Sequence, residues 1–286
     1  MKSLRLFLLS SFLFHLIVTP PLFSMGNYPV IPETQFLRVA VANGEKSILL
    51  KVAGPYEIRQ LNTGTLLQKG HFLETVFTPE MEGIRLGEES LKMYGVRVIP
   101  KREASLSLDG RRFRGVVDIL RQSNMTLLVV NHLDIEKYLY GVLPYEVPHD
   151  WPNEMLEIQA ILARSYALFK KMEHRSDDYD VVATVLSQRY GGREDEKRRA
   201  RRAVDRTVGK VLTYQGTLFP TFYHSTCGGQ TEDAVVAALW KKKLLPLQGV
   251  RCTTCDLSPF YRWERSFALE DIAFRLRKAE IGRAHV

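Results

Sequence analysis

The chain has 286 residues, of which 45% are hydrophobic and 25% are charged. This length and composition exclude a disordered tail, a peptide and a small disulfide-stapled scaffold, and they predict a folded protein of one large or two modest domains. The net charge of +8 favours an anionic partner, such as nucleic acid, acidic lipid or an anionic wall polymer, without choosing among them.

The first 24 residues (1–24) have the layout of a secretory signal peptide. Lys2 and Arg5 precede an apolar run, which prolines and the small Ser24 follow. The run of about 13 residues is shorter than the roughly 20 that a membrane-spanning helix needs. We therefore expect an exported protein of the periplasm or cell envelope, with membrane contact only through an uncleaved signal anchor. Export argues against nucleic acid as the partner.

Residues 25–130 have the pattern of a β-rich half. Apolar segments separated by Gly, Asn or Pro predict strands at 36–41, 47–52, 56–60 and 126–130. The clearest feature is a hairpin about the Asp109-Gly110 turn, where apolar and polar residues alternate. We expect Leu106, Leu108 and Phe113 to face the core.

Residues 131–286 have a mixed character. A short helical turn is expected at 131–141, closed by Gly141. Further expected elements are a long helix at 150–171, a basic helix at 194–208, a hairpin joining 210–214 to 217–226, and an amphipathic helix at 266–280. The long helix should be buried nearly all round, because apolar residues cover most of its faces: Met155, Ile158, Leu162, Tyr166 and Phe169 on one side, with alanines on another.

These elements predict an α+β protein, in which the β-rich N-terminal half packs on a mixed α/β half with a long buried helix. The basic run in the helix at 194–208 has two interpretations. It is a solvated helix face, or it is a contact with an anionic polymer.

One carboxylate, Glu146, lies between Pro144 and Pro148, just before the long helix. The prolines stiffen this connection, and the neighbours Tyr145 and Val147 can exclude water from the acid. Burial favours the protonated form of a carboxyl group, so the segment predicts a general acid. The alternative is a structural carboxylate that accepts backbone hydrogen bonds at the helix entrance. The residues alone leave both open.

The three cysteines and one histidine form two ligand pairs of zinc-like spacing. His224 and Cys227 are separated by two residues, as are Cys252 and Cys255. A Cys₃His set predicts a structural zinc site, which staples the fold and leaves no open position for catalysis. The main rival is a disulfide from Cys227 to Cys252 or Cys255, which would leave one thiol over.

Several ordered motifs resemble the SpoIID/LytB family. They are Asn131-His132-Leu133, Glu136–Pro148, Trp151-Pro152, Gln159–Ala167, Ser187–Gly192 and Tyr223–Gly229. The resemblance covers about 36–257. It implies either a lytic transglycosylase that cleaves peptidoglycan glycan strands lacking stem peptides, forming 1,6-anhydro-N-acetylmuramic acid ends, or a non-catalytic enhancer that partners a cell-wall amidase.

The resemblance also assigns roles to residues. Glu146 matches the family's catalytic acid, and Arg164 matches a functionally implicated arginine. On physical grounds we expect Arg164 to bind the lactyl carboxylate of muramic acid or to orient Glu146. Its alternative role is to tie down a loop carboxylate. The remaining predicted substrate-binding residues are Tyr166, Ser187, Gln188, Tyr190 and Ser225, and turn chemistry is the alternative explanation for those in the 187–192 loop. No serine hydrolase is expected, since Ser225 lacks an evident Asp partner and a nucleophile elbow.

The chain departs from the family at its C-terminus. The family's usual segment rich in Gly, His and Trp is absent, and residues 280–286 look like a translated sequencing adapter. We therefore expect a reading frame that was cut short, which would leave this polypeptide inactive if the missing part completes the groove.

Overall fold

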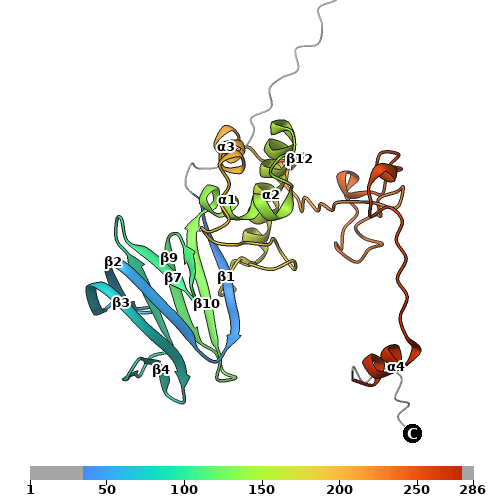
Figure 1. Ribbon diagram of the computed structural model, residues 1–286. Helices are drawn as coiled ribbons and strands as arrows, with labels where there is room; N and C mark the ends of the chain where they lie inside the picture. The colour runs from blue at the N-terminus through green and yellow to red at the C-terminus, as the bar shows by residue number, and fades with distance from the viewer. Residues whose placement is uncertain (1–34, 279–286) are drawn as a thin grey trace, which may run out of the picture.

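The computed structural model describes residues 35–278. A large sheet occupies the N-terminal part, and the helices α1, α2 and α3 gather at one end of it (Figure 1). The predicted α+β class is confirmed. The predicted signal segment 1–24 lies outside the described residues. Within the part of the chain that is described, no helix is both long and apolar enough to cross a membrane.

Thirteen strands are present in this part of the chain. In chain order they are β1 (Phe36–Glu45), β2 (Ile48–Gln60), β3 (Leu66–Glu80), β4 (Gly83–Leu86), β5 (Glu89–Leu91), β6 (Gly95–Pro100), β7 (Ser105–Leu108), β8 (Arg111–Phe113), β9 (Val116–Arg121), β10 (Leu127–Asp134), β11 (Val181–Val182), β12 (Thr213–Tyr214) and β13 (Thr217–Leu218). The main sheet has the order β11-β1-β10-β9-β6-β2-β3-β4-β5, and β7 pairs with both β2 and β8. Its pairs are antiparallel except for β1 with β11.

The helices are α1 (Ile135–Glu146), α2 (Asn153–Glu173), α3 (Arg198–Arg206) and α4 (Leu269–Lys278), with 3-10 turns η1 (Leu245–Leu247) and η2 (Cys255–Leu257). Helices α1, α2 and α3 contact one another, and α1 and α2 also contact β1. One hydrophobic cluster therefore continues from the sheet into the helices.

The predicted hairpin about Asp109-Gly110 is confirmed. Both turn residues have positive φ angles, 46° and 84°, as a type I′ turn requires. The turn joins β7 to β8, and Leu106, Leu108 and Phe113 are buried as expected.

The two strands expected at 47–52 and 56–60 form one continuous strand, β2. The Gly54-Pro55 pair between them makes a bulge rather than a turn, and the register with β3 shifts there. A bulge bends a strand without ending it. Because of this, the two halves of β2 pair with different strands, β7 and β6.

Strand β10 runs directly into α1. The carboxylate of Asp134 caps the helix by accepting hydrogen bonds from the backbone N–H groups of Glu136 (2.9 Å) and Lys137 (3.3 Å). The division expected between residues 130 and 131 falls inside β10, whose neighbours β1 and β9 both belong to the N-terminal half. The two halves therefore share a strand.

Helix α1 does not stop at Gly141, and that expectation is wrong. The helix continues through Pro144 to Glu146. Gly141 serves close packing instead, because a Cβ atom there would lie 2.6 Å from the carbonyl oxygen of Gly192 and 2.7 Å from the ring of Tyr190. The missing side chain lets the 187–192 loop lie against the helix.

We expect Gly141→Ala to lower the free energy of unfolding by about 1–3 kcal/mol, because overpacking in a filled site displaces its neighbours. Alanine is the better helix former, so a destabilisation isolates the packing effect. Urea unfolding gives the change. The matched control is Gly228→Ala, whose added methyl group meets no atom within 4 Å. Equal stability of the two variants would contradict this account.

The long helix is buried nearly all round only in its second half, whereas its first half buries one side, with Leu156 and Ala160. Residues 163–169 are all buried, whereas Met155 and Ile158 are 41% and 49% exposed. Burial nearly all round, as expected from composition, is therefore wrong for the first half. The apolar pattern alone does not tell where the covering elements end.

The basic helix and the hairpin after it are shorter than expected. Helix α3 starts at Arg198 rather than Glu194, and Glu194 and Glu196 bind Arg112 of β8 and the neighbouring Arg114. Part of the basic run is structural, since the Arg199 guanidinium donates to the backbone carbonyls of residues 149 and 151. The strands expected at 210–214 and 217–226 shrink to the two-residue strands β12 and β13.

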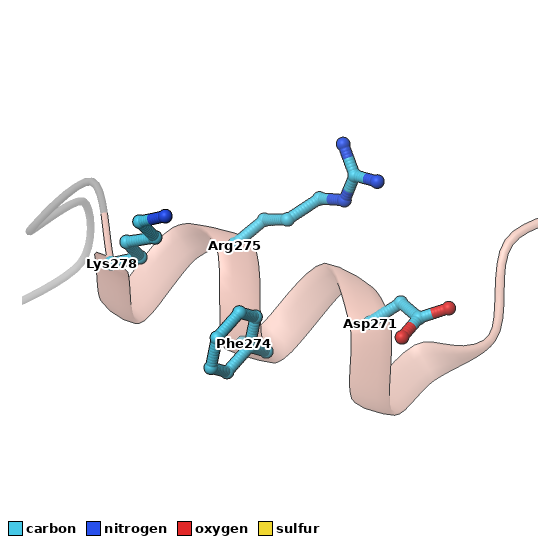
Figure 2. Close-up of a pocket in the computed structure, with 4 residues that line it drawn as sticks. All are labelled: Asp271, Phe274, Arg275 and Lys278. Carbon is cyan, nitrogen blue, oxygen red and sulfur yellow. The ribbon is translucent and has the colours of Figure 1, made fainter.

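The amphipathic helix predicted at 266–280 is present as α4. It lies away from the sheet and from the other helices (Figure 1) and has no buried residue. Figure 2 shows the side chains bordering a hollow beside it, and all of them come from α4 itself: Asp271, Phe274, Arg275 and Lys278. No predicted site residue is among them.

Candidate active site

Glu146 is the last residue of α1 and is half-buried. Its Oε1 atom accepts a hydrogen bond of 2.9 Å from the backbone N–H of Arg189, in the 187–192 loop. Among residues 35–278 it takes part in no ion pair; Arg164 pairs with Glu136 instead.

Three phenols lie near this carboxyl group: Tyr138 of α1, Tyr166 of α2, and Tyr223, whose hydroxyl forms a hydrogen bond with it. Burial raises the pKa of each phenol, and the charge of Glu146 raises each of them further. The three tyrosines therefore remain neutral hydroxyl groups over the whole physiological pH range, able to donate hydrogen bonds.

Gln188 joins two of these phenols. Its Nε2 donates to the hydroxyl of Tyr223 (3.1 Å) and to the carbonyl of Ala163 in α2 (3.2 Å), and its Oε1 accepts from the Tyr138 hydroxyl (3.2 Å). Gln188 is 1% exposed. It is therefore a buried link between α1, α2 and Tyr223, and the sugar contact expected for it is not available in this structure.

The 187–192 loop is fastened to the end of α1. A Cβ at Gly191 would lie 2.4 Å from the ring of Tyr145, so only glycine fits there. The guanidinium of Arg189 lies 4.5 Å from the centre of the same ring. The Ser187 hydroxyl accepts from the backbone N–H of Val182. These contacts hold the Arg189 N–H against Glu146.

Arg164 is 1% exposed, and its ion pair is with Glu136, at 2.8 and 2.6 Å. It also donates to the carbonyl of Lys210 (3.0 Å), and Glu136 accepts from the N–H of Gly209 (3.2 Å). The expected contact with a muramic acid carboxylate has no surface available. Arg164 instead ties down a carboxylate, the alternative left open by the sequence, although the carboxylate is in α1 rather than in a loop.

Tyr190 is also enclosed. It is 2% exposed, packs at 5.1 Å from the ring of Tyr138, and lies 3.3 Å from Asn131 through its hydroxyl. The face of the Tyr190 ring that was expected to stack on a sugar is covered, because Gly141 has no side chain and the ring packs directly against α1. Tyr166 is 7% exposed and contacts Phe222. Ser225 is exposed.

The three carboxylates that follow the 187–192 loop all bind other side chains. Glu194 and Glu196 bind Arg112 and Arg114, and Asp195 accepts from the hydroxyl of Tyr145. Each of the three carboxylates therefore has a side-chain partner other than Glu146. The arrangement is a single unpaired carboxyl group among neutral phenols.

Three positions that form the candidate site or support the helix beneath it were missed from the sequence. Tyr223 and Arg189 lie in recognised motifs, but neither was assigned a role; the signal for Tyr223 was its place before the glycine-rich strand end. Arg189 acts through its backbone, which gives no side-chain signal. Glu136 lies 28 residues from Arg164, and nothing in a single sequence joins them.

The three cysteines gather in a separate cluster. The Sγ atoms of Cys227, Cys252 and Cys255 all lie within 4.8 Å of one another, and no disulfide joins them. His224 does not belong to this cluster and is exposed. Three of the four ligands expected from the spacing therefore lie together, and the fourth does not. Hydrogen bonds from the Thr254 hydroxyl and backbone lower the pKa of Cys252 to about 6.

The sheet and the helices at one end of it define an α+β protein. The family described as SpoIID, Stage II sporulation protein, matches residues 123–214, which include β10, α1, α2 and α3. The chain belongs to the SpoIID family.

Three relatives extend this match. An uncharacterised protein of Brachyspira hyodysenteriae is 29% identical over 212 residues, 73% of this chain and 57% of that protein. The amidase enhancer of Bacillus subtilis is 35% identical over 154 residues, 52% of this chain and 21% of that protein. A Chlamydia pneumoniae protein is 30% identical over 195 residues, 64% of this chain and 70% of that protein. The chain thus spans little more than half of the first relative and about a fifth of the second.

Proposed function

We propose that this protein acts on the cell wall as a lytic transglycosylase, with Glu146 as its only acid and base. The observation that carries the proposal is the unpaired, half-buried carboxyl group of Glu146, which a backbone N–H and neutral phenols surround. Membership of the SpoIID family and similarity to an amidase enhancer support the cell-wall setting. The cell envelope is the proposed location.

A single carboxyl group is sufficient when the nucleophile belongs to the substrate. Glycoside hydrolases commonly need two carboxylates, one to protonate the leaving oxygen and one to attack or to activate water. Here Glu146 protonates the glycosidic oxygen as its bond to C1 of N-acetylmuramic acid breaks. The C6 hydroxyl of the same sugar attacks C1, and its proton passes to Glu146. The acid is regenerated, and a 1,6-anhydro end forms without water.

Mass spectrometry of the products tests the proposal directly. The protein is incubated with purified glycan strands that lack stem peptides. We expect fragments with 1,6-anhydro-N-acetylmuramic acid ends, each lighter by one water molecule than the hydrolysis product. Hydrolysed ends, or strands left intact, would contradict a transglycosylase in this chain.

Tyr223 is a positioning residue for Glu146 in this proposal. We expect Tyr223→Phe to lower kcat by about 10- to 100-fold with little change in KM, because the variant loses the hydrogen bond between the Tyr223 hydroxyl and Glu146. A hydrogen bond to a charged group contributes roughly 1.5–3 kcal/mol. Steady-state kinetics on the stem-free strands gives both constants. Tyr94→Phe, at a tyrosine that is 57% exposed, is the control. A change in KM alone would show that Tyr223 binds substrate rather than assisting the acid.

A second candidate function is an enhancer of a cell-wall amidase. The observation that favours it is the 35% identity to the Bacillus subtilis amidase enhancer. In that case the same surface binds glycan or the amidase without cutting the strand. Stimulation of a purified amidase, measured without strand cleavage, would support this alternative.

A further inference from the structure

The cysteine cluster lies outside the proposed active site and joins two distant segments of the chain. Cys227 follows the segment that carries Tyr223, whereas Cys252 lies just before η2 and Cys255 is its first residue. The backbone between them is already paired: the N–H of Cys252 donates to the carbonyl of Gly229 (3.0 Å), and Gln230 forms a bridge with Arg251.

The spacing of the sulfur atoms is that of ligands around one metal ion. Sγ of Cys255 lies 3.5 Å from that of Cys227 and 3.8 Å from that of Cys252. Two thiolates bound tetrahedrally to zinc at about 2.3 Å are separated by about 3.8 Å. A disulfide brings its sulfur atoms to about 2.05 Å and joins two of them, leaving the third sulfur unused.

The donor set selects the metal. Three soft sulfur ligands favour zinc over magnesium or calcium, which prefer oxygen. No carboxylate of the described residues belongs to the cluster. We propose that Cys227, Cys252 and Cys255 bind one zinc ion through three thiolates, and that His224 is not one of its ligands.

The ion then has a defined structural task. It fastens residues 252–255 to the segment that begins with Tyr223, whose hydroxyl contacts Gln188. Beyond this point the chain packs sparsely, as the wide separation of α4 from the helices shows (Figure 1). A zinc ion bound here would limit the motion of the chain after Tyr223. This structural role does not depend on whether Glu146 is catalytic.

The test is metal analysis of the whole protein, purified without chelator. We expect one zinc per chain, and at least a tenfold loss of zinc in Cys252→Ser. His224→Ala should keep the full zinc content. Zinc lost in His224→Ala would overturn the three-thiolate assignment, and absence of zinc from the unaltered protein would overturn the site itself.

Two further measurements test the zinc site even if a cysteine variant fails to fold. Cobalt exchanged into the unaltered protein should give the sulfur-to-cobalt charge-transfer absorption of thiolate ligands, with the same spectrum in His224→Ala. Thiol titration of the denatured, unreduced protein should count three thiols. A count of one thiol would mean that a disulfide had formed, which would contradict the zinc site.

Discussion

Glu146→Gln is expected to lower the rate of anhydro-end formation by at least about 10³-fold, because general acid–base catalysis contributes roughly 10²–10⁴-fold and this residue is proposed to perform both proton transfers. Glutamine keeps the size of the side chain and an oxygen that can accept from the Arg189 N–H at 2.9 Å. It cannot give up or take a proton. The fold should therefore survive while cleavage is lost.

The matched control is Glu154→Gln, an exposed glutamate in the first turn of α2, which should keep full activity. Mass spectrometry of stem-free strands after single time points compares the two variants. Cleavage by Glu146→Gln at the unaltered rate would remove Glu146 from the chemistry. If the protein is an amidase enhancer instead, Glu146→Gln should leave the stimulation nearly unchanged.

Arg164→Leu is expected to lower the free energy of unfolding by about 3–5 kcal/mol, because it leaves the carboxylate of Glu136 buried without its partner. The pair is bidentate, at 2.8 and 2.6 Å, and Arg164 is 1% exposed. The loss should appear as a lower midpoint of denaturant unfolding with an unchanged slope.

Two controls separate the buried charge from other effects. The double variant Arg164→Leu with Glu136→Leu should regain most of the lost stability, because a buried ion pair replaced by apolar residues is often neutral. Arg112→Leu breaks the exposed pair with Glu194 and should lower the free energy of unfolding by no more than about 1 kcal/mol. Equal losses in Arg164→Leu and Arg112→Leu would contradict the buried-pair account.

Local signals in the sequence predicted the local structure well. The Asp109-Gly110 pair predicted its hairpin because a type I′ turn needs positive φ at both central positions, and few residue types adopt positive φ. The apolar pattern predicted the long helix α2. Each of these features depends on residues close together in the chain.

The partner of Arg164 could not be read in the same way. Glu136 and Glu146 are both acidic and both belong to α1, yet they lie ten residues apart, about 15 Å along a helix. Arg164 can reach only one of them. Which one it reaches depends on how α2 crosses α1, and a single sequence does not encode that crossing in any local pattern.

Gly141 and His224 illustrate a related difficulty. Glycine near a helix end usually signals termination, but here the requirement is a close approach to Tyr190. The two-residue spacing of His224 and Cys227 fits a zinc ligand pair, yet the backbone after Tyr223 leaves the imidazole exposed. In both cases the residue type is informative, and the tertiary neighbours decide its meaning.

Strand β10 runs directly into α1, and the strands that pair with β10 decide whether the region matched by the family can fold alone. Residues 123–214 match the SpoIID family, but β10 within them pairs on one side with β1 and on the other with β9, both of which lie outside that range. Cut out at these limits, the segment would present two unpaired strand edges. The region by which the family is recognised is therefore not an autonomous folding unit, and a chimaera that exchanges it must carry the flanking strands as well.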